Sequence, residues 1–476
     1  MIPSRLRPSL QALDRAGGGL PLSFAQQGFW FMDQLVPGNP FCNMSAPLRL
    51  RGALDGDALR WSLRGLVRRH EVLRTRFEDD AGQPRQVVDD CDELEPKVVD
   101  LGGMTDDGRE AEARRLAGLE AMTAFDLGRA PLLRGLLLRL GRDDHVFVLT
   151  THHIVCDGSS WGVLARDLQE LYDARRGCRE PDLEPLPYQY ADYAAWERDR
   201  LTQDVLDRQL RYWKRQLAEA PEVRLPVDRA RPPMLSYRAG YREFVVPEGV
   251  VAKLREATRS QGATLYMTLL AAFQALLARH AGQADVSVAT PIATRARREL
   301  RDVVGPFLNT LVVRTDLCGE PCFRELVGRV RKVALEAYEH RAVPFQQVVT
   351  AVHPQRSASF NPLAQVLFQF VPGGEARLRL SDLDVATFAT GDVVRTQFDL
   401  ELHMFESDGT LWGRFVYSRD LFETRTLDRI AERFERVLEA LACQPDRSIG
   451  DVDLLGEGER QRLEAWNRTE HPVPQA

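Results

Sequence analysis

The sequence predicts an α/β protein built from two lobes. Helical and strand-like periodicities alternate over residues 20–177 and alternate again over residues 236–450. Between these ranges, residues 178–235 are rich in proline and charged side chains, which is typical of a connection between lobes. We therefore expect an N-terminal linker at 1–19, a first lobe at 20–177, an inter-lobe connection at 178–235, a second lobe at 236–450 and a further linker at 451–476.

The composition limits the classes of protein to consider. Of 476 residues, 44% are hydrophobic and 28% are charged, which is ordinary for a globular protein with a large core. A net charge of −6 argues against a nucleic-acid-binding surface. The N-terminus has no apolar signal region, and the most apolar stretch, 263–278, is too short and too polar to span a membrane. Seven scattered cysteines without histidines at zinc spacing indicate reduced thiols and no metal site, so we expect a cytoplasmic protein.

The first lobe is predicted to begin with a helix capped by Ser23, because Phe24, Phe29, Trp30 and Met32 follow as its apolar positions. The same periodicities predict the later elements of this lobe. These are helices at 57–70 and 107–124 and strands at 131–140 and 146–151, the two strands being paired through a turn at 141–144.

The second lobe repeats this alternation. Apolar residues at helical spacing predict helices at 248–260, 264–280, 322–340 and 423–442. The helix at 264–280 is apolar on most of its surface, so we expect it to be buried. Strand-like runs occur at 243–246, 285–289, 304–314, 365–370, 398–405 and 411–417.

The two lobes are organised around the stretch from Thr151 to Gly158, which contains two adjacent histidines. A strand precedes it, and helical spacing resumes after Gly158, with Ser159 or Ser160 available to cap the helix. The histidines therefore lie at the carboxyl end of a strand, before the turn into a helix. In an extended chain, neighbouring side chains point to opposite faces, so only one histidine can easily serve a given cavity.

The residues of this stretch can each be interpreted as structural or as functional. We expect His152 to be a buried histidine held by the backbone and His153 to be the functional one. Asp157 is either a helix N-cap or a carboxylate paired with a distant arginine. Gly158 suits a close backbone approach or a positive φ. Cys156 lies on the face opposite His153 in an extended segment, which argues against a cysteine–histidine nucleophile.

The segment 152–158 (HHIVCDG) resembles the signature of condensation domains of nonribosomal peptide synthetases. Six further segments resemble that family's other motifs in the right order: 23–30, 69–77, 190–196, 304–310, 343–346 and 359–363. The departures from the usual motifs are local: Gly28 stands where arginine is usual, Thr294 where glycine is common, Leu308 for valine, Gln346 for glutamate and Phe360 for arginine. The tail at 454–467 is similar to the linker that leads into an adenylation domain.

The resemblance implies an architecture and a reaction. The fold would be two chloramphenicol acetyltransferase-like α/β lobes set in a V around a central tunnel. Donor and acceptor peptidyl carrier proteins would deliver thioesters on phosphopantetheine arms, and an amide would form between them. The domain itself would bind no cofactor, would adjoin an adenylation domain and would be monomeric when excised.

The resemblance also implies roles for particular residues. His153 would orient the attacking amine and accept its proton late, and the backbone N–H of Gly158 would face the developing oxyanion. His152, Asp157 and Arg295 would support the site, with Asp157 paired to Arg295.

The sequence leaves open the position of Asn309 and whether the chain is catalytically active. Asn309 would lie near the tunnel by resemblance, but it can equally be a turn residue. The chain could also be a catalytically silent platform of the same fold, which binds a carrier protein and recruits other enzymes to it. An epimerisation or heterocyclisation domain is disfavoured, because the motifs that would distinguish them are not found in the sequence.

Overall fold

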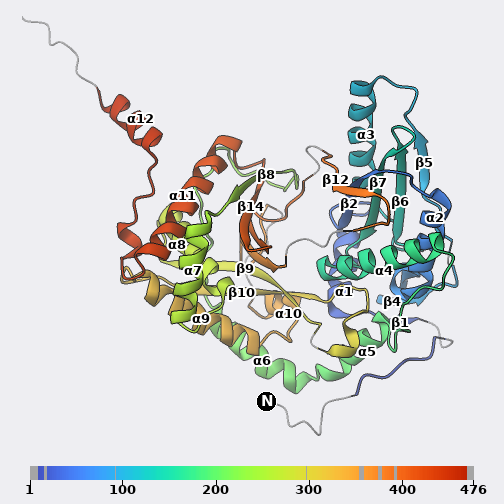
Figure 1. The fold of residues 1–476 in the computed structure, drawn as a ribbon. Helices are drawn as coiled ribbons and strands as arrows, with labels where there is room; N and C mark the ends of the chain where they lie inside the picture. The colour runs from blue at the N-terminus through green and yellow to red at the C-terminus, as the bar shows by residue number, and fades with distance from the viewer. Residues whose placement is uncertain are drawn as a thin grey trace, which may run out of the picture.

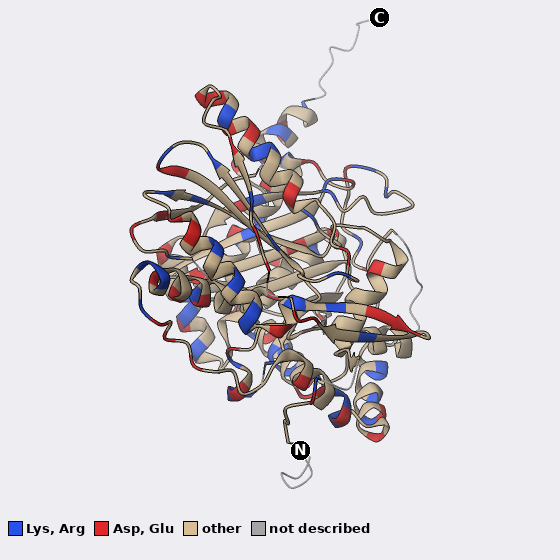
Figure 2. Ribbon diagram, turned by 90° about the vertical axis from the view of Figure 1, so that its right-hand side faces the viewer, with Lys and Arg blue, Asp and Glu red and all other residues tan. Residues whose placement is uncertain are grey.

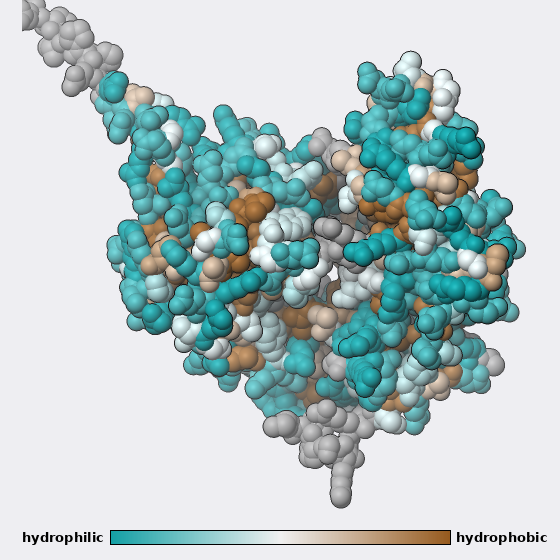
Figure 3. Space-filling view, in the orientation of Figure 1, coloured by the Kyte–Doolittle hydropathy of each residue, from teal (hydrophilic) through white to brown (hydrophobic). Residues whose placement is uncertain are grey.

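The computed structural model describes residues 9–15, 19–91, 93–295, 297–352, 359–373, 378–390 and 394–468. Two lobes stand side by side and diverge like the arms of a V, joined along the base by helices α5 (Tyr190–Arg200) and α6 (Gln203–Gln216) (Figure 1). The space between the arms is hollowed, and hydrophobic residues lie on its walls (Figure 3). Acidic and basic residues are interspersed along the helices in the view of Figure 2, as expected for a modest net charge.

The first lobe contains a five-stranded sheet whose order is β12-β2-β7-β6-β5. Its central strand, β7 (Asp144–His152), is buried on both faces because helices cover both sides of the sheet. The helices are α2 (Gly56–Arg69) and α4 (Gly158–Arg176) on one face and α3 (Asp106–Ala121) on the other. The remaining strands of this sheet are β2 (Asn43–Arg51), β5 (Lys97–Asp100), β6 (Leu133–Arg139) and β12 (Asp384–Thr387).

A small sheet extends the first lobe at its base. It consists of β1 (Leu20–Pro21), β3 (Thr75–Asp80) and β4 (Gln83–Val88), in the order β1-β4-β3. Helix α1 (Phe24–Leu35) follows β1. Its N-cap is Ser23, which forms a capping box with Gln26, so the predicted cap is confirmed.

The second lobe contains a six-stranded sheet with the order β10-β9-β11-β13-β14-β8. The buried helix predicted at 264–280 is α8 (Leu265–Ala281), in which every residue from 267 to 278 is buried, Thr268 and Gln274 included. Helices α7 (Glu248–Ser260), α9 (Phe323–Glu339) and α11 (Thr424–Cys443) pack around α8 in the same core. The strands are β8 (Ala239–Val245), β9 (Asp285–Ala293), β10 (Leu308–Asp316), β11 (Val366–Pro372), β13 (Leu400–Ser407) and β14 (Thr410–Ser418), and short helices α10 (Phe345–Val352) and α12 (Glu457–Asn467) complete the described chain.

Two segments of the range 236–450 leave the second lobe and join the first. Strand β12 pairs antiparallel with β2 as an edge strand of the first sheet, with Asp384 opposite Arg51. Between β9 and β10, Leu300, Val304 and Phe307 pack into the core of the first lobe. The sequence pattern did not indicate this exchange, which ties the two lobes together at two places.

A glycine makes one of these crossings possible. Gly305 has φ +158, and a Cβ at this position would lie 1.9 Å from the ring of Tyr190. The Tyr190 hydroxyl donates to the carbonyl of Pro306 at 3.0 Å and lies 2.8 Å from the Ser23 hydroxyl. The backbone of the second lobe can therefore pass directly against a buried tyrosine of α5.

Candidate active site between the lobes

The histidine stretch is held by the strand beside it. Strand β7 ends at His152, which pairs with Asn43 of β2, and the chain turns at His153 before α4 begins at Gly158. The backbone N–H of His153 donates to the carbonyl of Cys42 at 2.7 Å. The predicted strand, turn and helix are therefore confirmed, and the position of the turn is fixed by β2.

His153 presents a neutral imidazole with one nitrogen unengaged. Its Nδ1 lies 3.0 Å from the carbonyl oxygen of Cys156, and because a carbonyl only accepts, Nδ1 carries the hydrogen. Nε2 then carries the lone pair, and it makes no hydrogen bond with the described residues. Burial lowers the pKa of His153, although the carboxylate of Asp157 opposes this effect. The ring of Phe29 stacks on the imidazole, with 5.1 Å between the ring centroids and 13° between the planes.

His152 is buried, as expected, and has the opposite tautomer. Its Nδ1 accepts a hydrogen bond from the backbone N–H of Ile154 at 3.1 Å, and Phe125 contacts its ring edge-on. Burial lowers the pKa of His152 to about 3. The imidazole therefore stays neutral in the folded protein over the physiological range of pH.

This buried histidine predicts a loss of stability in acid. Below its ordinary pKa of 6.5, His152 takes up a proton in the unfolded chain but not in the folded one, until the pH approaches 3. Stability is therefore lost as the pH falls through this window, at about 1.4 kcal/mol per pH unit. Between pH 6.5 and 5, the free energy of unfolding should fall by about 2 kcal/mol less in His152→Asn than in the wild type. Urea unfolding at both pH values measures this, and equal losses in the two proteins would contradict it.

Asp157 is both a helix N-cap and the partner of a distant arginine, the two interpretations that the sequence offered. It is the N-cap of α4, where its Oδ1 accepts from the backbone N–H of Ser160 at 2.7 Å. The same oxygen lies 3.6 Å from Nη2 of Arg295. The expected cap by Ser159 or Ser160 is wrong, because the Ser160 hydroxyl instead donates to the carbonyl of Gly305 and accepts from its N–H.

Arg295 connects the segment between β9 and β10 to the histidine stretch. Its Nη1 donates to the carbonyl oxygens of Leu300, Arg301 and Val303 at 2.6–3.2 Å, and its Nη2 donates to the Ser160 hydroxyl at 3.0 Å. The guanidinium also lies 4.4 Å above the ring of Phe307. Burial lowers the pKa of Arg295. A buried cation with this many partners holds the turn between the lobes in one shape.

The backbone conformation of Gly158 differs from the one that the sequence suggested. Gly158 is the first residue of α4, its φ is not positive, and a Cβ there would meet nothing within 4 Å. The expected positive φ is therefore wrong, and no described part of the chain approaches a side-chain position at Gly158 closely. Its backbone N–H belongs to the first turn of the helix, where donors have no partner inside the helix, and it makes no hydrogen bond within the described residues.

Cys156 is buried, and its backbone carbonyl, not its thiol, contacts His153. Burial and the nearby carboxylate of Asp157 raise the pKa of the Cys156 thiol well above its usual range. Because the thiolate is the reactive form, the side chain is unsuited to act as a nucleophile here.

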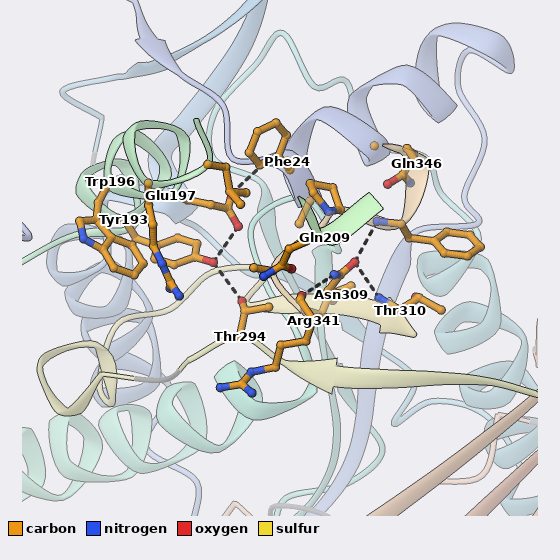
Figure 4. A pocket seen from close by; sticks show the side chains of 18 of the residues that line it. Phe24, Tyr193, Trp196, Glu197, Gln209, Thr294, Asn309, Thr310, Arg341 and Gln346 are labelled. Carbon is orange, nitrogen blue, oxygen red and sulfur yellow. Dashed lines mark hydrogen bonds between the residues drawn. The ribbon is translucent and has the colours of Figure 1, made fainter. Parts of the chain in front are cut away.

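A cavity of about 780 Å³ lies beside this stretch, where α1, α5, the ends of β9 and β10 and helix α10 meet (Figure 4). His153 does not line it, but Phe29 does, and Phe29 is the ring stacked on His153. One aromatic ring therefore connects the cavity to the imidazole. Whether a continuous tunnel runs through the molecule stays a prediction.

Asn309 lines the cavity, but its polar atoms are occupied. Its Nδ2 donates to the carbonyl oxygens of Arg341 and Val343, and its Oδ1 accepts from the N–H groups of Thr310 and Phe345. The side chain therefore fixes the segment between α9 and α10 to the end of β10 (Figure 4).

Several residues of the cavity were not singled out by the sequence. Burial raises the pKa of Glu197, whose carboxyl accepts from the N–H of Phe24 and from the hydroxyl of Tyr193. The Tyr193 hydroxyl also contacts that of Thr294, which links α5 to the second lobe (Figure 4). Tyr193 lies in the motif at 190–196 and Thr294 is one of the departures, but neither was predicted to line a cavity. Glutamate is common on surfaces, so no local signal marked Glu197.

Potential metal ligands are not clustered in the described part of the chain. Within those residues, no group of three or more histidine, cysteine, aspartate or glutamate side chains is arranged to hold a metal ion. No single helix of the described chain has the length and hydropathy to cross a membrane. Helices α7 and α8 meet these criteria only as a pair, bent by 106°.

The chain is similar to known proteins over nearly its whole length. The profile of the condensation domain matches residues 17–464. The chain is 43% identical over 462 residues to one of the proteins that make up the linear gramicidin synthase of Brevibacillus parabrevis, a match that covers 96% of this chain but 9% of that protein. Among solved structures, it is similar to the X-domain from teicoplanin biosynthesis, with a TM-score of 0.83 and 34% identity over 94% of this chain and 100% of that one.

The same X-domain has also been solved in a complex with OxyB, with a TM-score of 0.83 and 34% identity over 95% of this chain and 99% of that one. The predicted two-lobed α/β fold and the family resemblance are confirmed by these matches. The chain belongs to the condensation domain family of nonribosomal peptide synthetases.

Proposed function

We propose that the chain forms an amide bond between a donor acyl or peptidyl thioester and the amine of an acceptor aminoacyl thioester. Each substrate would be carried on the phosphopantetheine arm of a peptidyl carrier protein, and the domain itself would bind no cofactor. The observation that carries this proposal is the neutral imidazole of His153, whose Nε2 is unengaged beside the N-terminus of α4.

The chemistry requires placement more than activation. A thioester is already reactive, and an α-amine with a pKa of about 7.7–8.0 is partly neutral at pH 7. In this scheme Nε2 of His153 accepts a hydrogen bond from the amine and directs the nitrogen lone pair at the thioester carbonyl. As the C–N bond forms and the C–S bond breaks, His153 takes the amine proton and returns it to the departing thiolate.

The N-terminus of α4 supplies the complementary partner. The backbone N–H of Gly158 makes no hydrogen bond within the described residues and lies at the positive end of the helix dipole. A developing oxyanion at this point would accept from that N–H, which is an arrangement that lowers the energy of a tetrahedral transition state. His152, Asp157 and Arg295 would hold the turn in this geometry without contacting substrate.

The test of this function is direct. One carrier protein is loaded with a short acyl thioester and a second with an aminoacyl thioester, the protein is added, and the acceptor carrier is weighed by intact mass spectrometry. We expect an amide-linked product on the acceptor carrier. No product with any donor, together with measurable carrier binding, would contradict the proposal.

A second candidate function is a catalytically silent platform that binds a carrier protein and recruits another enzyme. The similarity to the X-domain, which was solved in a complex with OxyB, favours this candidate. The unengaged Nε2 of His153 and the open N-terminus of α4 favour catalysis, because a platform needs neither. Neighbouring partners in either case would be carrier proteins and an adenylation domain.

The lowered pKa of His153 predicts how the rate depends on pH. The ratio of the wild-type rate to the His153→Ala rate reports the imidazole alone, because ionisation of the substrate amine affects both proteins equally. We expect the midpoint of the fall in this ratio with decreasing pH to lie below pH 6.5, since protonation of His153 is displaced to lower pH by burial. Single-turnover rates measured across that range provide the ratio. A fall centred above pH 6.5 would contradict the neutral imidazole.

A further inference from the structure

Two aromatic rings from different lobes pack on each other close to the histidine turn. Phe41 lies in the first lobe, just before β2, and Tyr237 lies in the second lobe, just before β8. Their ring centroids are 3.7 Å apart, and the planes are inclined by 31°. Both side chains are half-buried. An aromatic pair contributes to stability beyond the area that it buries, so side chains as well as exchanged segments hold the two lobes together.

Arg395, which also belongs to the second lobe, contacts the same part of the first lobe. Its guanidinium lies over the ring of Phe41, 5.9 Å from the centroid. Its Nε and Nη2 donate to Sδ of Met122, the residue that ends α3, at 3.3 and 3.2 Å. A thioether is a weak acceptor and a cation is attracted to an aromatic face, so each contact alone is modest. Together with Tyr237, they give Phe41 two partners in the second lobe and Met122 one.

Phe41 adjoins the backbone that positions His153. The next residue, Cys42, accepts at its carbonyl from the N–H of His153 at 2.7 Å. Asn43 then begins β2 and pairs with His152. A movement of Phe41 is therefore transmitted through one residue of backbone and one hydrogen bond to the functional histidine.

Met122 is tied to the same point of the chain. The side chain of Asn43 donates to the carbonyl oxygens of Ala121 and Thr123, which flank Met122, at 2.9 and 2.7 Å. The end of α3 and the beginning of β2 are thus joined by two hydrogen bonds. The contacts of the second lobe with Phe41 and with Met122 consequently act on one structural unit, the unit from which the histidine turn is held.

The second-lobe side of this contact is fixed by hydrogen bonds around Tyr237. Tyr237 has φ +60, a left-handed conformation that is unfavourable for residues other than glycine. Its carbonyl accepts from the N–H of Thr396 at 3.2 Å. The carboxylate of Asp420 accepts from the N–H and the hydroxyl of the preceding Ser236 at 2.9 and 2.8 Å. Such strain persists where neighbouring contacts determine the backbone, so the ring that packs on Phe41 is offered from a fixed support.

We propose that Phe41, Tyr237 and Arg395 form an inter-lobe clasp that positions the histidine turn, so that the second lobe controls the orientation of His153 through the carbonyl of Cys42. The consequence for the reaction rate rests on the proposed function, whereas the consequence for the turn does not. The three clasp residues do not line the cavity described above. They are positioning residues that act on His153 through the backbone.

Hydrogen exchange measures the clasp without any substrate. The amide of His153 exchanges when its hydrogen bond to Cys42 opens, so its exchange rate reports how firmly the turn is held. Phe41→Ala removes one ring of the pair. Tyr237→Gly removes the other, and glycine adopts the positive φ without strain. We expect each substitution to raise the exchange rate of this amide by about two- to tenfold, the factor that corresponds to the strength of an aromatic pair. Mass spectrometry with electron-transfer fragmentation resolves the single amide.

Three further variants make the exchange measurement specific. Trp412→Ala removes a half-buried ring from a stack that lies wholly in the second lobe, with Phe405 at 4.0 Å, and should leave the exchange of His153 unchanged. Tyr237→Phe keeps the ring and should retain wild-type exchange. The double variant Phe41→Ala/Tyr237→Gly should exchange no faster than the faster single variant, because either substitution alone removes the pair. If Phe41→Ala does not fold, Phe41→Leu, which keeps apolar volume without a ring, replaces it.

Three results of the exchange experiment would overturn the clasp. The first is wild-type exchange of the His153 amide in both Phe41→Ala and Tyr237→Gly. The second is an equal rise in Trp412→Ala, because the effect would then be a general loss of stability. The third is a double variant in which the two effects multiply, because the two rings would then act independently.

The coupling reaction between loaded carrier proteins gives a second readout. We expect Phe41→Ala and Tyr237→Gly to lower kcat by about two- to tenfold and to leave KM for both carriers unchanged, because the clasp acts on His153 and not on docking. In the His153→Ala background, Phe41→Ala should lower kcat no further. A rise in KM at constant kcat, or an undiminished effect in that background, would contradict a positioning role. If the wild type forms no product but the exchange effects are observed, the clasp stands and the proposed function fails.

Discussion

Replacing His153 with alanine should lower the rate of amide formation by about 10²- to 10⁴-fold, which is the usual contribution of a positioned acid–base group. The physical reason is the loss of Nε2, the unengaged acceptor in the turn before α4. The protein should stay folded, because the imidazole is half-buried and its contacts are the carbonyl of Cys156 and the ring of Phe29. Single-turnover coupling between two loaded carrier proteins measures the rate, and circular dichroism checks the fold.

Two further substitutions separate the functions of the ring nitrogens. Asparagine at position 153 can still donate toward the carbonyl of Cys156 but has no acceptor at the position of Nε2. Glutamine places an amide oxygen near the position of Nε2, so it can orient the amine but cannot carry its proton. We expect His153→Asn to be as slow as alanine and His153→Gln to be intermediate. Full activity of His153→Ala would exclude a catalytic role for this residue.

Replacing Asp157 with alanine should reduce the free energy of unfolding by about 3–5 kcal/mol, the range for removing one partner of a buried ion pair. Asp157 is buried and the side chain of Arg295 is 11% exposed, with 3.6 Å between Oδ1 and Nη2, so the substitution leaves the guanidinium without its carboxylate. The substitution also removes the N-cap of α4, which alone is worth about 1 kcal/mol. Urea unfolding measures the loss, and activity should disappear together with stability.

Asparagine at position 157 is the matched control, because it caps helices about as well as aspartate but carries no charge. The difference between Asp157→Ala and Asp157→Asn therefore isolates the cap, and the remaining loss in Asp157→Asn isolates the charge. A double-mutant cycle with Arg295→Met should give a coupling energy of about 0.5–3 kcal/mol. An Asp157→Ala protein that folds with wild-type stability but is inactive would instead assign Asp157 a direct part in the reaction.

The sequence by itself determined the parts of this protein that depend on neighbouring residues. The strand before His152, the turn, and the helix after Gly158 follow from a change of hydrophobic period within about twenty residues. The cap of α1 by Ser23 and the burial of α8 follow from equally local patterns. Motif resemblance added the pairing of Asp157 with Arg295, although the two residues are far apart in the chain.

The tertiary structure alone decided what distant segments do together. No local pattern states that β12 pairs with β2, because a four-residue strand can join any exposed sheet edge. The stacking of Phe29 on His153 and the contact of Gly28 with Gln346 depend on how α1 packs between the lobes. Gly158 suggested a positive φ in sequence, yet it is the first residue of a helix and its φ is not positive. Periodicity is encoded residue by residue, whereas a cavity is the space left when all the elements have packed.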